Sequence, residues 1–294
     1  MTVRVIADST SYVPEEELTR LGIATLQLSA TLAGVTRDEK DIDSEAFYRQ
    51  MRSSGEFPSS SQPSVGSITD AFESAIEAGE DVVAVVLSSR MSGTFETAGM
   101  VREQVLARMP RGHIEIVDSE SNSMQEGFAV LAAARAAHDG ADTDAVIAAA
   151  RSAMRRSRWL FVPATLEYLR IGGRIGNAAA LLGALLQVRP ILTVEQGVTS
   201  TVRTVRTQRR ALKDIAEMVA ADSREHGLTD AVVHHILAPD VGEELADEIE
   251  RLTGLRPRIQ LLGPVIGLHV GPGSVGVVYL TERPLPGRDP GSAA

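Results

Sequence analysis

The feature that most constrains this chain is a run of six apolar residues, Val82–Leu87, that ends abruptly in two serines. An unbroken apolar run of this length is typical of a strand that is buried on both faces, as in a parallel sheet. Shorter strand-like runs lie at Val3–Ala7 and Ile114–Val117, and patterns typical of helices lie between them. This alternation predicts an α/β fold in which right-handed crossovers connect the strands of a parallel sheet.

A second series of strand and helix patterns begins at Trp159 and includes an expected hairpin turn at Gly197. We therefore place an N-terminal α/β domain at residues 1–157 and a second α/β domain at residues 158–283. The length of 294 residues agrees with two domains, because a domain commonly contains about 100–200 residues. The tail, 284–294, contains Pro, Gly and Ser, and we expect it to be disordered.

The composition excludes several classes of function. Lys and Arg number 29, and Asp and Glu number 39, so the formal net charge is −10. This balance argues against nucleic acid or an anionic membrane surface as the main partner. The absence of cysteine removes disulfides, thiol nucleophiles and Cys-ligated metals. The longest apolar stretch, 178–186, is far shorter than the ~20 residues of a membrane-spanning helix, so we expect a soluble, cytoplasmic protein without integral membrane association.

The histidines do not form a pattern typical of metal ligands. His234 and His235 are adjacent on a predicted strand, so their side chains point to opposite faces, and we expect one to be buried and one exposed. His113, His138 and His226 have no partners at the spacing of metal ligands. We therefore expect neither a metal nor a cofactor.

Small polar residues follow three of the predicted strands, as Asp8-Ser9, Ser88-Ser89 and Asp118-Ser119. In open α/β sheets, ligands bind beyond the carboxyl ends of the strands. Hydroxyl groups and helix N-termini that gather there suit an anion or a carboxylate. Each of these residues would equally serve as an ordinary cap of the helix that follows it, and the sequence leaves both interpretations open.

Two further polar segments precede expected helices in the N-terminal part. Ser59–Ser64 has the composition of a polar loop made rigid by Pro63. In Ser92-Gly93-Thr94, the glycine allows a ligand to approach the backbone, and both hydroxyls can point toward it. The same tripeptide also makes an ordinary N-cap. The chain contains neither a G-x-S-x-G nucleophile elbow nor a P-loop motif.

Two segments of the C-terminal part carry further polar groups. Gly172-Gly173-Arg174 follows a predicted amphipathic helix that bears Leu166 and Leu169, and the glycines either serve a site or form a plain C-cap with Arg174 in solvent. Pro264–Gly273 is rich in Gly and Pro, so we expect a loop of defined backbone there. An isolated histidine is usually structural, but His269 in such a loop is a candidate donor to a carboxylate.

A basic cluster also stands out on this acidic chain: Arg203, Arg206, Arg209 and Arg210. It is either the solvated start of a helix or a site for an anionic group or a partner protein.

Taken together, these segments resemble the pattern of the DegV family, bacterial fatty-acid-binding proteins that work with a fatty acid kinase. The resemblance covers residues 3–282, nearly the whole chain. It is carried, in order, by Asp8-Ser9-Thr10, Ser60-Ser61-Gln62-Pro63-Ser64, Ser88-Ser89-Arg90-Met91-Ser92-Gly93-Thr94-Phe95, Asp118-Ser119, Leu166-Glu167-Tyr168-Leu169-Arg170-Ile171-Gly172-Gly173-Arg174-Ile175, Arg206-Thr207 and Gly267-Leu268-His269-Val270-Gly271-Pro272-Gly273. Any one of these elements is common, whereas all of them in this order form a specific signal.

The resemblance implies two α/β domains, the second with a mixed sheet, and a long-chain fatty acid bound between them. It places the carboxylate of the fatty acid at Ser60, Ser61, Ser92, Gly93, Thr94 and His269. The family usually has Thr at the position of Ser60, and the hydroxyl group is retained here. The resemblance further implies a partner kinase that phosphorylates the carboxylate to an acyl-phosphate. The protein would then be a carrier and not an enzyme, with at most transient membrane contact.

Apolar residues near these segments are expected to form a tunnel for the acyl chain. A chain of ~16 carbons gains about 0.8 kcal/mol per buried CH₂, so the tunnel would set the affinity and the polar end the orientation. The expected tunnel walls or partner contacts are Leu166, Leu169, Gly172, Gly173, Ile266, Leu268 and the stretch 178–188. Ordinary core packing would explain the apolar members equally well. We expect Arg174 and Arg206 near the opening, in contact with the kinase or the acyl-phosphate.

Two other functions stay open on the sequence. One is a serine hydrolase or acyltransferase with Ser92 or Ser61 as nucleophile and His269 as base. The other is a regulatory protein that senses an acyl group or another small anion, although the sequence shows no DNA-binding or signalling segment.

Overall fold

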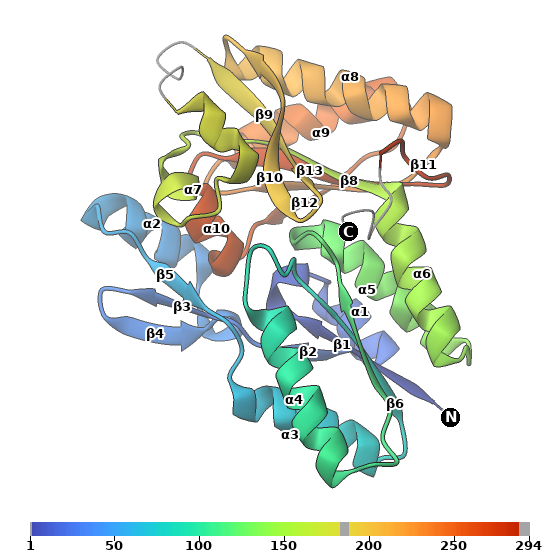
Figure 1. The fold of residues 1–294 in the computed structure, drawn as a ribbon. Helices are drawn as coiled ribbons and strands as arrows, with labels where there is room; N and C mark the ends of the chain where they lie inside the picture. Colours follow the sequence, from blue (N-terminus) through green and yellow to red (C-terminus); the bar gives the residue numbers. More distant parts are fainter. Residues whose placement is uncertain (1, 183–187, 288–294) are drawn as a thin grey trace.

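Two sheets of different topology organise the molecule (Figure 1). The computed structural model describes residues 2–182 and 188–287. The N-terminal sheet has the order β2-β1-β6-β7, and its neighbouring strands are parallel. Its strands are β1 (Val3–Asp8), β2 (Ala24–Leu26), β6 (Asp81–Val86) and β7 (Ile114–Asp118). The predicted parallel sheet is therefore confirmed.

Helices cover both faces of the N-terminal sheet, because successive residues of a strand point to opposite faces. Ile6 of β1 packs in a cluster with Ile68 and Val101 of two helices, whereas its neighbours Val5 and Ala7 pack in a cluster on the other face. The helices of this half are α1 (Glu15–Leu21), α2 (Ser44–Ser54), α3 (Val65–Glu77), α4 (Thr94–Arg108), α5 (Ser123–His138) and α6 (Thr143–Arg156), with 3₁₀-helices at Ser9–Ser11 and Glu39–Asp41.

The C-terminal sheet is mixed and has the order β10-β9-β8-β13-β11-β12. The pair β11–β12 is parallel, and the other four pairs are antiparallel. Its strands are β8 (Ser157–Val162), β9 (Arg189–Glu195), β10 (Val198–Val205), β11 (Leu228–His235), β12 (Arg258–Leu261) and β13 (Val275–Thr281). Helices α8 (Gln208–His226) and α9 (Pro239–Thr253) cover its outer face (Figure 1). The predicted hairpin at Gly197 joins β9 to β10.

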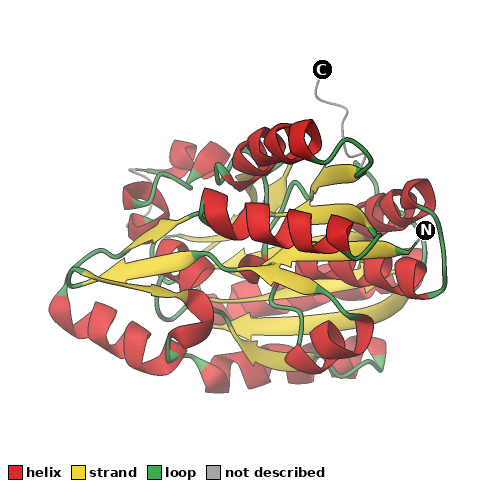
Figure 2. Ribbon diagram, turned by 90° about the horizontal axis from the view of Figure 1, so that it is seen from below, coloured by secondary structure: helices red, strands yellow, loops and turns green. Residues whose placement is uncertain are grey.

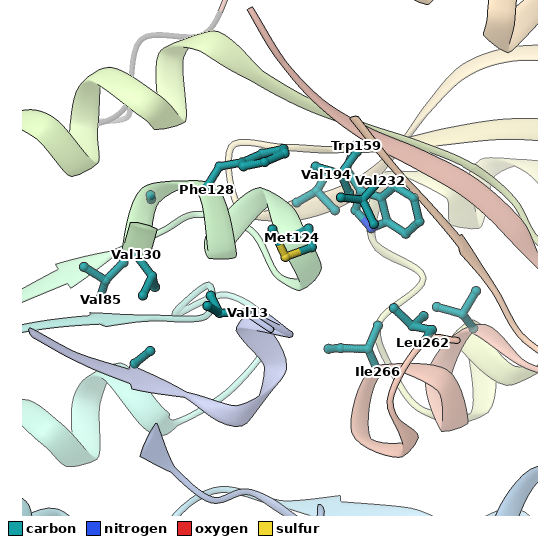
Figure 3. Close-up of a cluster of buried hydrophobic side chains, with 14 of the residues drawn as sticks. Val13, Val85, Met124, Phe128, Val130, Trp159, Val194, Val232, Leu262 and Ile266 are labelled. Carbon is teal, nitrogen blue, oxygen red and sulfur yellow. The ribbon is translucent and has the colours of Figure 1, made fainter. Parts of the chain in front are cut away.

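Helix α5 lies between the two sheets and contacts β1 and β6 as well as β8 and β13. Figure 3 shows Met124 and Phe128 of α5 between Val85 of the N-terminal sheet and Trp159 of the C-terminal sheet. Seen from below, helices lie above, below and in front of the strands (Figure 2). One hydrophobic cluster therefore connects the N-terminal half, residues 2–156, to the C-terminal half, residues 157–287.

The change from one sheet to the other falls at the expected boundary, because α6 ends at Arg156 and β8 begins at Ser157. The division into two independent domains stays a prediction. The chain remains packed beyond residue 283, where we expected the disordered tail to begin. Leu285 is 3% exposed, and its N–H donates to the carbonyl oxygen of Arg155 at 2.9 Å. Residues 288–294 of that tail lie outside the described residues.

Two segments that we expected to be loops form regular structure instead. Ser59–Ser61 is strand β5, the edge of a small antiparallel sheet with β3 (Ser29–Leu32) and β4 (Val35–Asp38). Three serines carry no alternation of apolar residues, so this strand depends on its pairing with β3. The stretch around His269 is helix α10 (Pro264–Val270). Pro264 stands in its first turn, where the missing N–H of proline is tolerated.

Two short helical segments lie on either side of Gly172-Gly173-Arg174. Helix α7 (Glu167–Ile171) agrees with the prediction for that segment. The apolar stretch 178–186 overlaps a 3₁₀-helix over Gly176–Leu181, and residues 183–187 lie outside the described residues. Within 2–182 and 188–287, no helix is long and apolar enough to cross a membrane.

Candidate ligand-binding site

A cavity of about 310 Å³ lies between the two halves. Its polar lining residues are Ser60, Ser61, Gln62, Ser92, Gly93, Asn122, Arg174, Thr199 and His269. Its apolar lining residues are Leu28, Leu87, Met91, Trp159, Phe161, Leu169, Val194, Val265, Ile266 and Val270. Both halves contribute to each set, so the cavity depends on how they pack together. A cavity that combines apolar walls with convergent polar groups is typical of small-molecule sites.

The polar lining is centred on a contact between the halves. The Oγ of Ser60 on β5 lies 2.9 Å from Nε2 of His269 on α10. Burial, with the positive charge of Arg174 as a smaller cause, lowers the pKa of His269 from 6.5 to about 4. The imidazole is therefore neutral at neutral pH. Its Nδ1 is buried and has no hydrogen-bond partner among the described residues.

Glycines let other segments approach His269 closely. A Cβ atom on Gly172 would lie 2.2 Å from Nδ1 of His269, far inside van der Waals contact. Gly173 has a φ of +70°, and the N–H of Arg174 donates to the carbonyl oxygen of Leu169 at 2.9 Å, as at a helix C-cap. The two glycines thus end α7, and Gly172 also makes room for the ring of His269.

The segment Ser92-Gly93-Thr94 forms a turn at the start of α4. Ser92 and Gly93 line the cavity, whereas Thr94 is fully buried, and its hydroxyl lies 2.9 Å from that of Ser92. A Cβ on Gly93 would lie 2.3 Å from Oε1 of Gln62. Gln62 in turn donates to Oγ1 of Thr97 on α4 at 2.5 Å. The glycine therefore allows the β5 segment to pack directly against α4.

The expected cationic residues occupy different places. Arg174 lines the cavity, and its Nε donates to the carbonyl oxygen of Met91 at 3.0 Å. Arg206 is exposed on the segment between β10 and α8, outside the cavity lining. In the basic cluster, Arg203 and Arg210 pair with the buried carboxylate of Asp214 at 2.9 and 2.6 Å. These two arginines therefore have a structural role.

The polar residues at the three strand ends hold the loops around the cavity rather than lining it in the described structure. Asp8 accepts a hydrogen bond from the N–H of Leu87 at 2.7 Å, and Asp118 accepts one from the N–H of Ser89 at 3.2 Å. The hydroxyl of Ser88 donates to the carbonyl oxygen of Gly197 at 2.8 Å. Asp8 also caps the 3₁₀-helix that follows it, since it accepts from the N–H of Thr10 at 2.9 Å, whereas the other contacts connect neighbouring loops.

Some of the expected wall residues line the cavity, and others lie in the core beside it. Leu169 and Ile266 line the cavity, whereas Leu166 and Leu268 are buried in the adjoining core. The sequence did not identify Gln62, Asn122 or Trp159 as lining residues. Trp159 and Phe161 alternate along β8, so they share one face of the strand. This spacing is visible in the sequence, but it does not show which face of β8 would contact a ligand.

His234, His235 and one glycine-rich segment lie outside the cavity lining. His234 is 1% exposed, as expected for the buried member of the pair, whereas His235 is half-buried and not exposed as we expected. The described residues contain no cluster of three His, Asp or Glu side chains that could hold a metal ion. Gly271–Gly276 has the spacing G-x-G-x-x-G, but it leads from α10 into β13. A dinucleotide-binding turn leads from a strand into a helix, so this match has the wrong context.

Sequence comparison relates the whole chain to one family. A family model described as "Uncharacterised protein, DegV family" matches residues 2–282. A DegV domain-containing protein of Clostridium acetobutylicum is 42% identical over 283 residues, which cover 96% of this chain and 99% of the relative. Protein DegV of Bacillus subtilis is 31% identical over 288 residues, with 95% and 99% of the two chains covered.

Solved structures share the fold. DegV of Bacillus subtilis, described as a fatty acid binding protein, has a TM-score of 0.85 at 28% identity and covers 96% of this chain and 99% of its own. A DegV family protein of Thermus thermophilus, described by its fatty acid binding, has a TM-score of 0.86 at 28% identity, with 96% and 100% covered. The expected α/β architecture with its mixed second sheet is confirmed, and the chain belongs to the DegV family.

Proposed function

We propose that this protein binds a long-chain fatty acid in the cavity between its halves, with the carboxylate at Ser60. The observation that carries the proposal is the Ser60–His269 pair inside a cavity whose other lining is mostly apolar. The fatty acid binding described for the Bacillus subtilis and Thermus thermophilus proteins supports it.

The pair directs one hydroxyl proton toward a ligand. When the neutral imidazole carries its proton on Nε2, it donates to Oγ of Ser60, and the Ser60 O–H is left to donate to a carboxylate oxygen. Ser61, Ser92 and Gly93 line the same cavity and complete the proposed carboxylate site, with Thr94 supporting the turn. The positive charge of Arg174 favours an anion there.

The apolar lining supplies most of the affinity in this proposal. Each CH₂ group removed from water contributes about 0.8 kcal/mol, whereas a hydrogen bond contributes about 1 kcal/mol net. The residues that would contact the acyl chain include Leu169 and Ile266, with Leu166 and Leu268 behind them.

We also propose that the protein is a cytoplasmic carrier that presents the carboxylate to a partner fatty acid kinase, which forms the acyl-phosphate. The chain itself would catalyse no step, and any contact with a membrane would be transient. Arg174 at the cavity and exposed Arg206 are the proposed contacts for the kinase or the acyl-phosphate, with Gly172 and Gly173 beside them.

The carrier proposal is tested on protein purified from cells. Native mass spectrometry should show one long-chain fatty acid per chain, released on denaturation and identified after extraction. An empty protein that also fails to bind palmitate would contradict the proposal. For the partner, Arg206→Ala should leave palmitate affinity unchanged and slow acyl-phosphate formation by the kinase, with Arg151→Ala on α6 as the exposed control. Equal rates for Arg206→Ala and the unmodified protein would remove Arg206 from the contact.

A serine hydrolase is the second candidate, because the Ser60–His269 distance also suits a nucleophile and its base. The histidine pairs with Ser60, not with Ser92 or Ser61, the two nucleophiles that the sequence suggested. Delipidated protein is incubated with an ester of palmitate. Turnover that disappears in Ser60→Ala would favour the hydrolase, whereas binding without turnover favours the carrier.

A further inference from the structure

Helix α10, which carries His269, is held at its start by the N-terminal half. Gly263 precedes the helix and supplies no side-chain cap, and Pro264 has no N–H. The next two amides donate across the boundary between the halves. The N–H of Val265 donates to Oε1 of Glu39 at 2.9 Å, and the N–H of Ile266 donates to Oη of Tyr12 at 3.2 Å.

These two acceptors are themselves connected. The hydroxyl of Tyr12 donates to the same Oε1 of Glu39 at 2.9 Å, and the hydroxyl of Ser9 donates to Oε2 at 2.5 Å. The backbone N–H of Glu39 donates to the carbonyl oxygen of Leu28 at 2.8 Å, and Leu28 lines the cavity. Glu39 is only 7% exposed. It therefore joins the cavity wall of one half to the helix of the other.

The residue before α10 is held from a second direction. The fully buried hydroxyl of Tyr48 on α2 lies 2.8 Å from the carbonyl oxygen of Leu262 and 2.7 Å from that of Gly263. A Cβ on Gly267 would lie 1.7 Å from this hydroxyl. The start of α10 is thus fixed both through its amides and through the carbonyl groups that precede it.

We propose that Glu39 is a positioning residue that, through the first turn of α10, keeps His269 against Ser60. Helix α10 has only seven residues, so a shift of its first turn moves the last turn, where His269 stands. Loss of the Glu39 carboxylate leaves the buried amide of Val265 without its acceptor, which the structure relieves by displacing the helix. The inference rests on the proposed function only in assigning the carboxylate of a fatty acid to the Ser60–His269 pair.

The first experiment needs no ligand. Heteronuclear NMR of the delipidated protein follows the ring nitrogens of His269 in Glu39→Ala, Glu39→Gln and Tyr12→Phe. Glu39→Gln keeps an oxygen that accepts from Val265 and Tyr12, so we expect its Nε2 signal to match the unmodified protein. We expect Glu39→Ala and Tyr12→Phe to shift that signal toward the value seen in Ser60→Ala. The exposed neighbour Asp38→Ala is the control. An unchanged signal in both Glu39→Ala and Tyr12→Phe would overturn the inference.

The second experiment measures palmitate affinity in Glu39→Ala, His269→Ala and the double variant. If Glu39 acts through His269, each single change weakens binding by about tenfold, and the double variant is no weaker than His269→Ala alone. Losses that multiply would show independent effects and overturn the inference. If His269→Ala does not weaken binding, the proposed carboxylate site is wrong, while the NMR result still decides the role of Glu39. Tyr12→Phe provides the same cycle if Glu39→Ala does not fold.

Discussion

The Oγ of Ser60 and Nε2 of His269 lie 2.9 Å apart, although 209 residues separate them in the chain. One comes from an edge strand of three serines and the other from the last turn of a seven-residue helix. The contact exists only when both halves of the molecule are in place. The geometry of the proposed ligand site therefore depends on how the two halves pack.

The lowered pKa of His269 predicts a specific loss of stability in acid. Its pKa falls from 6.5 to about 4 on folding, because burial disfavours the charged ring. The stability that His269 contributes as a neutral ring is fully present above pH 6.5 and is lost as the pH falls toward 4. It is lost because the unfolded chain then binds a proton that the folded chain does not. His269→Gln should reduce the slope of unfolding free energy against pH by up to ~1.4 kcal/mol per pH unit. Identical slopes from urea unfolding would contradict the assignment.

The charge of Arg174 contributes to the lowered pKa of His269, so substitution of Arg174 should change both this pKa and the binding of palmitate. Its positive charge is the second cause that lowers the pKa of His269, after burial. Arg174→Met should therefore raise the pKa of His269 toward 6.5 and weaken palmitate binding, because one charge favours both the neutral ring and an anionic ligand. NMR titration of the ring measures the first effect and calorimetry the second. A pKa that stays at its original value in Arg174→Met would show that the charge does not reach the ring.

Substitutions at Gly172 and Gly173 test two effects separately: the close contact with His269 and the backbone conformation at the end of α7. A Cβ on Gly172 meets Nδ1 of His269 at 2.2 Å, whereas nothing lies within 4 Å of a Cβ on Gly173. Gly172→Ala should displace the ring and weaken palmitate binding about tenfold. Gly173→Ala, whose φ is +70°, should cost about 1 kcal/mol of stability and leave affinity nearly unchanged. The prediction fails if the two variants bind palmitate equally well.

Asp8 and Glu126 form a buried acid pair in the N-terminal half. The hydroxyl of Thr10 lies 2.6 Å from Oδ1 of Asp8 and 3.2 Å from Oε2 of Glu126. Burial, and then the charge of Asp8, holds the pKa of Glu126 well above its usual value, so Glu126 retains the proton. Glu126→Gln should change the unfolding free energy by less than about 1 kcal/mol, because one neutral group replaces another.

Asp8→Asn is the matched change in the same pair. The two carboxylate oxygens of Asp8 accept from the backbone amides of Thr10 and Leu87, and asparagine has only one oxygen. We expect Asp8→Asn to cost about 1–3 kcal/mol in urea unfolding. Equal stability of Asp8→Asn and Glu126→Gln would mean that the proton is not held by Glu126.

The sequence predicted those parts of the fold that local patterns encode. The apolar run Val82–Leu87 identified the centre of the parallel sheet, and Gly197 identified the β9–β10 hairpin. Strand β5 was missed because three serines have no strand pattern of their own. Helix α10 was missed because the groups that accept its first amide protons, on Glu39 and Tyr12, lie more than two hundred residues away.

The candidate site likewise combines features that the local sequence predicts with contacts between distant residues that it does not. Ser60, Ser92 and His269 were identifiable as polar residues in glycine- or proline-rich surroundings, and all three line the cavity. The contacts between these residues could not be predicted, because the sequence does not show that His269 pairs with Ser60 rather than with Ser92. Arg206 belongs to a recognisable segment but lies outside the cavity lining, so its role depends on a partner.

The central claim, that Ser60 and its bond to His269 receive the carboxylate of a fatty acid, is tested most directly by calorimetric titration of delipidated protein with palmitate. Ser59 lies next to Ser60 on β5, is exposed and does not line the described cavity, so Ser59→Ala is the matched control for Ser60→Ala. We expect Ser59→Ala to bind palmitate like the unmodified protein and Ser60→Ala to bind about tenfold more weakly. Equal affinity of Ser60→Ala and Ser59→Ala would contradict the account.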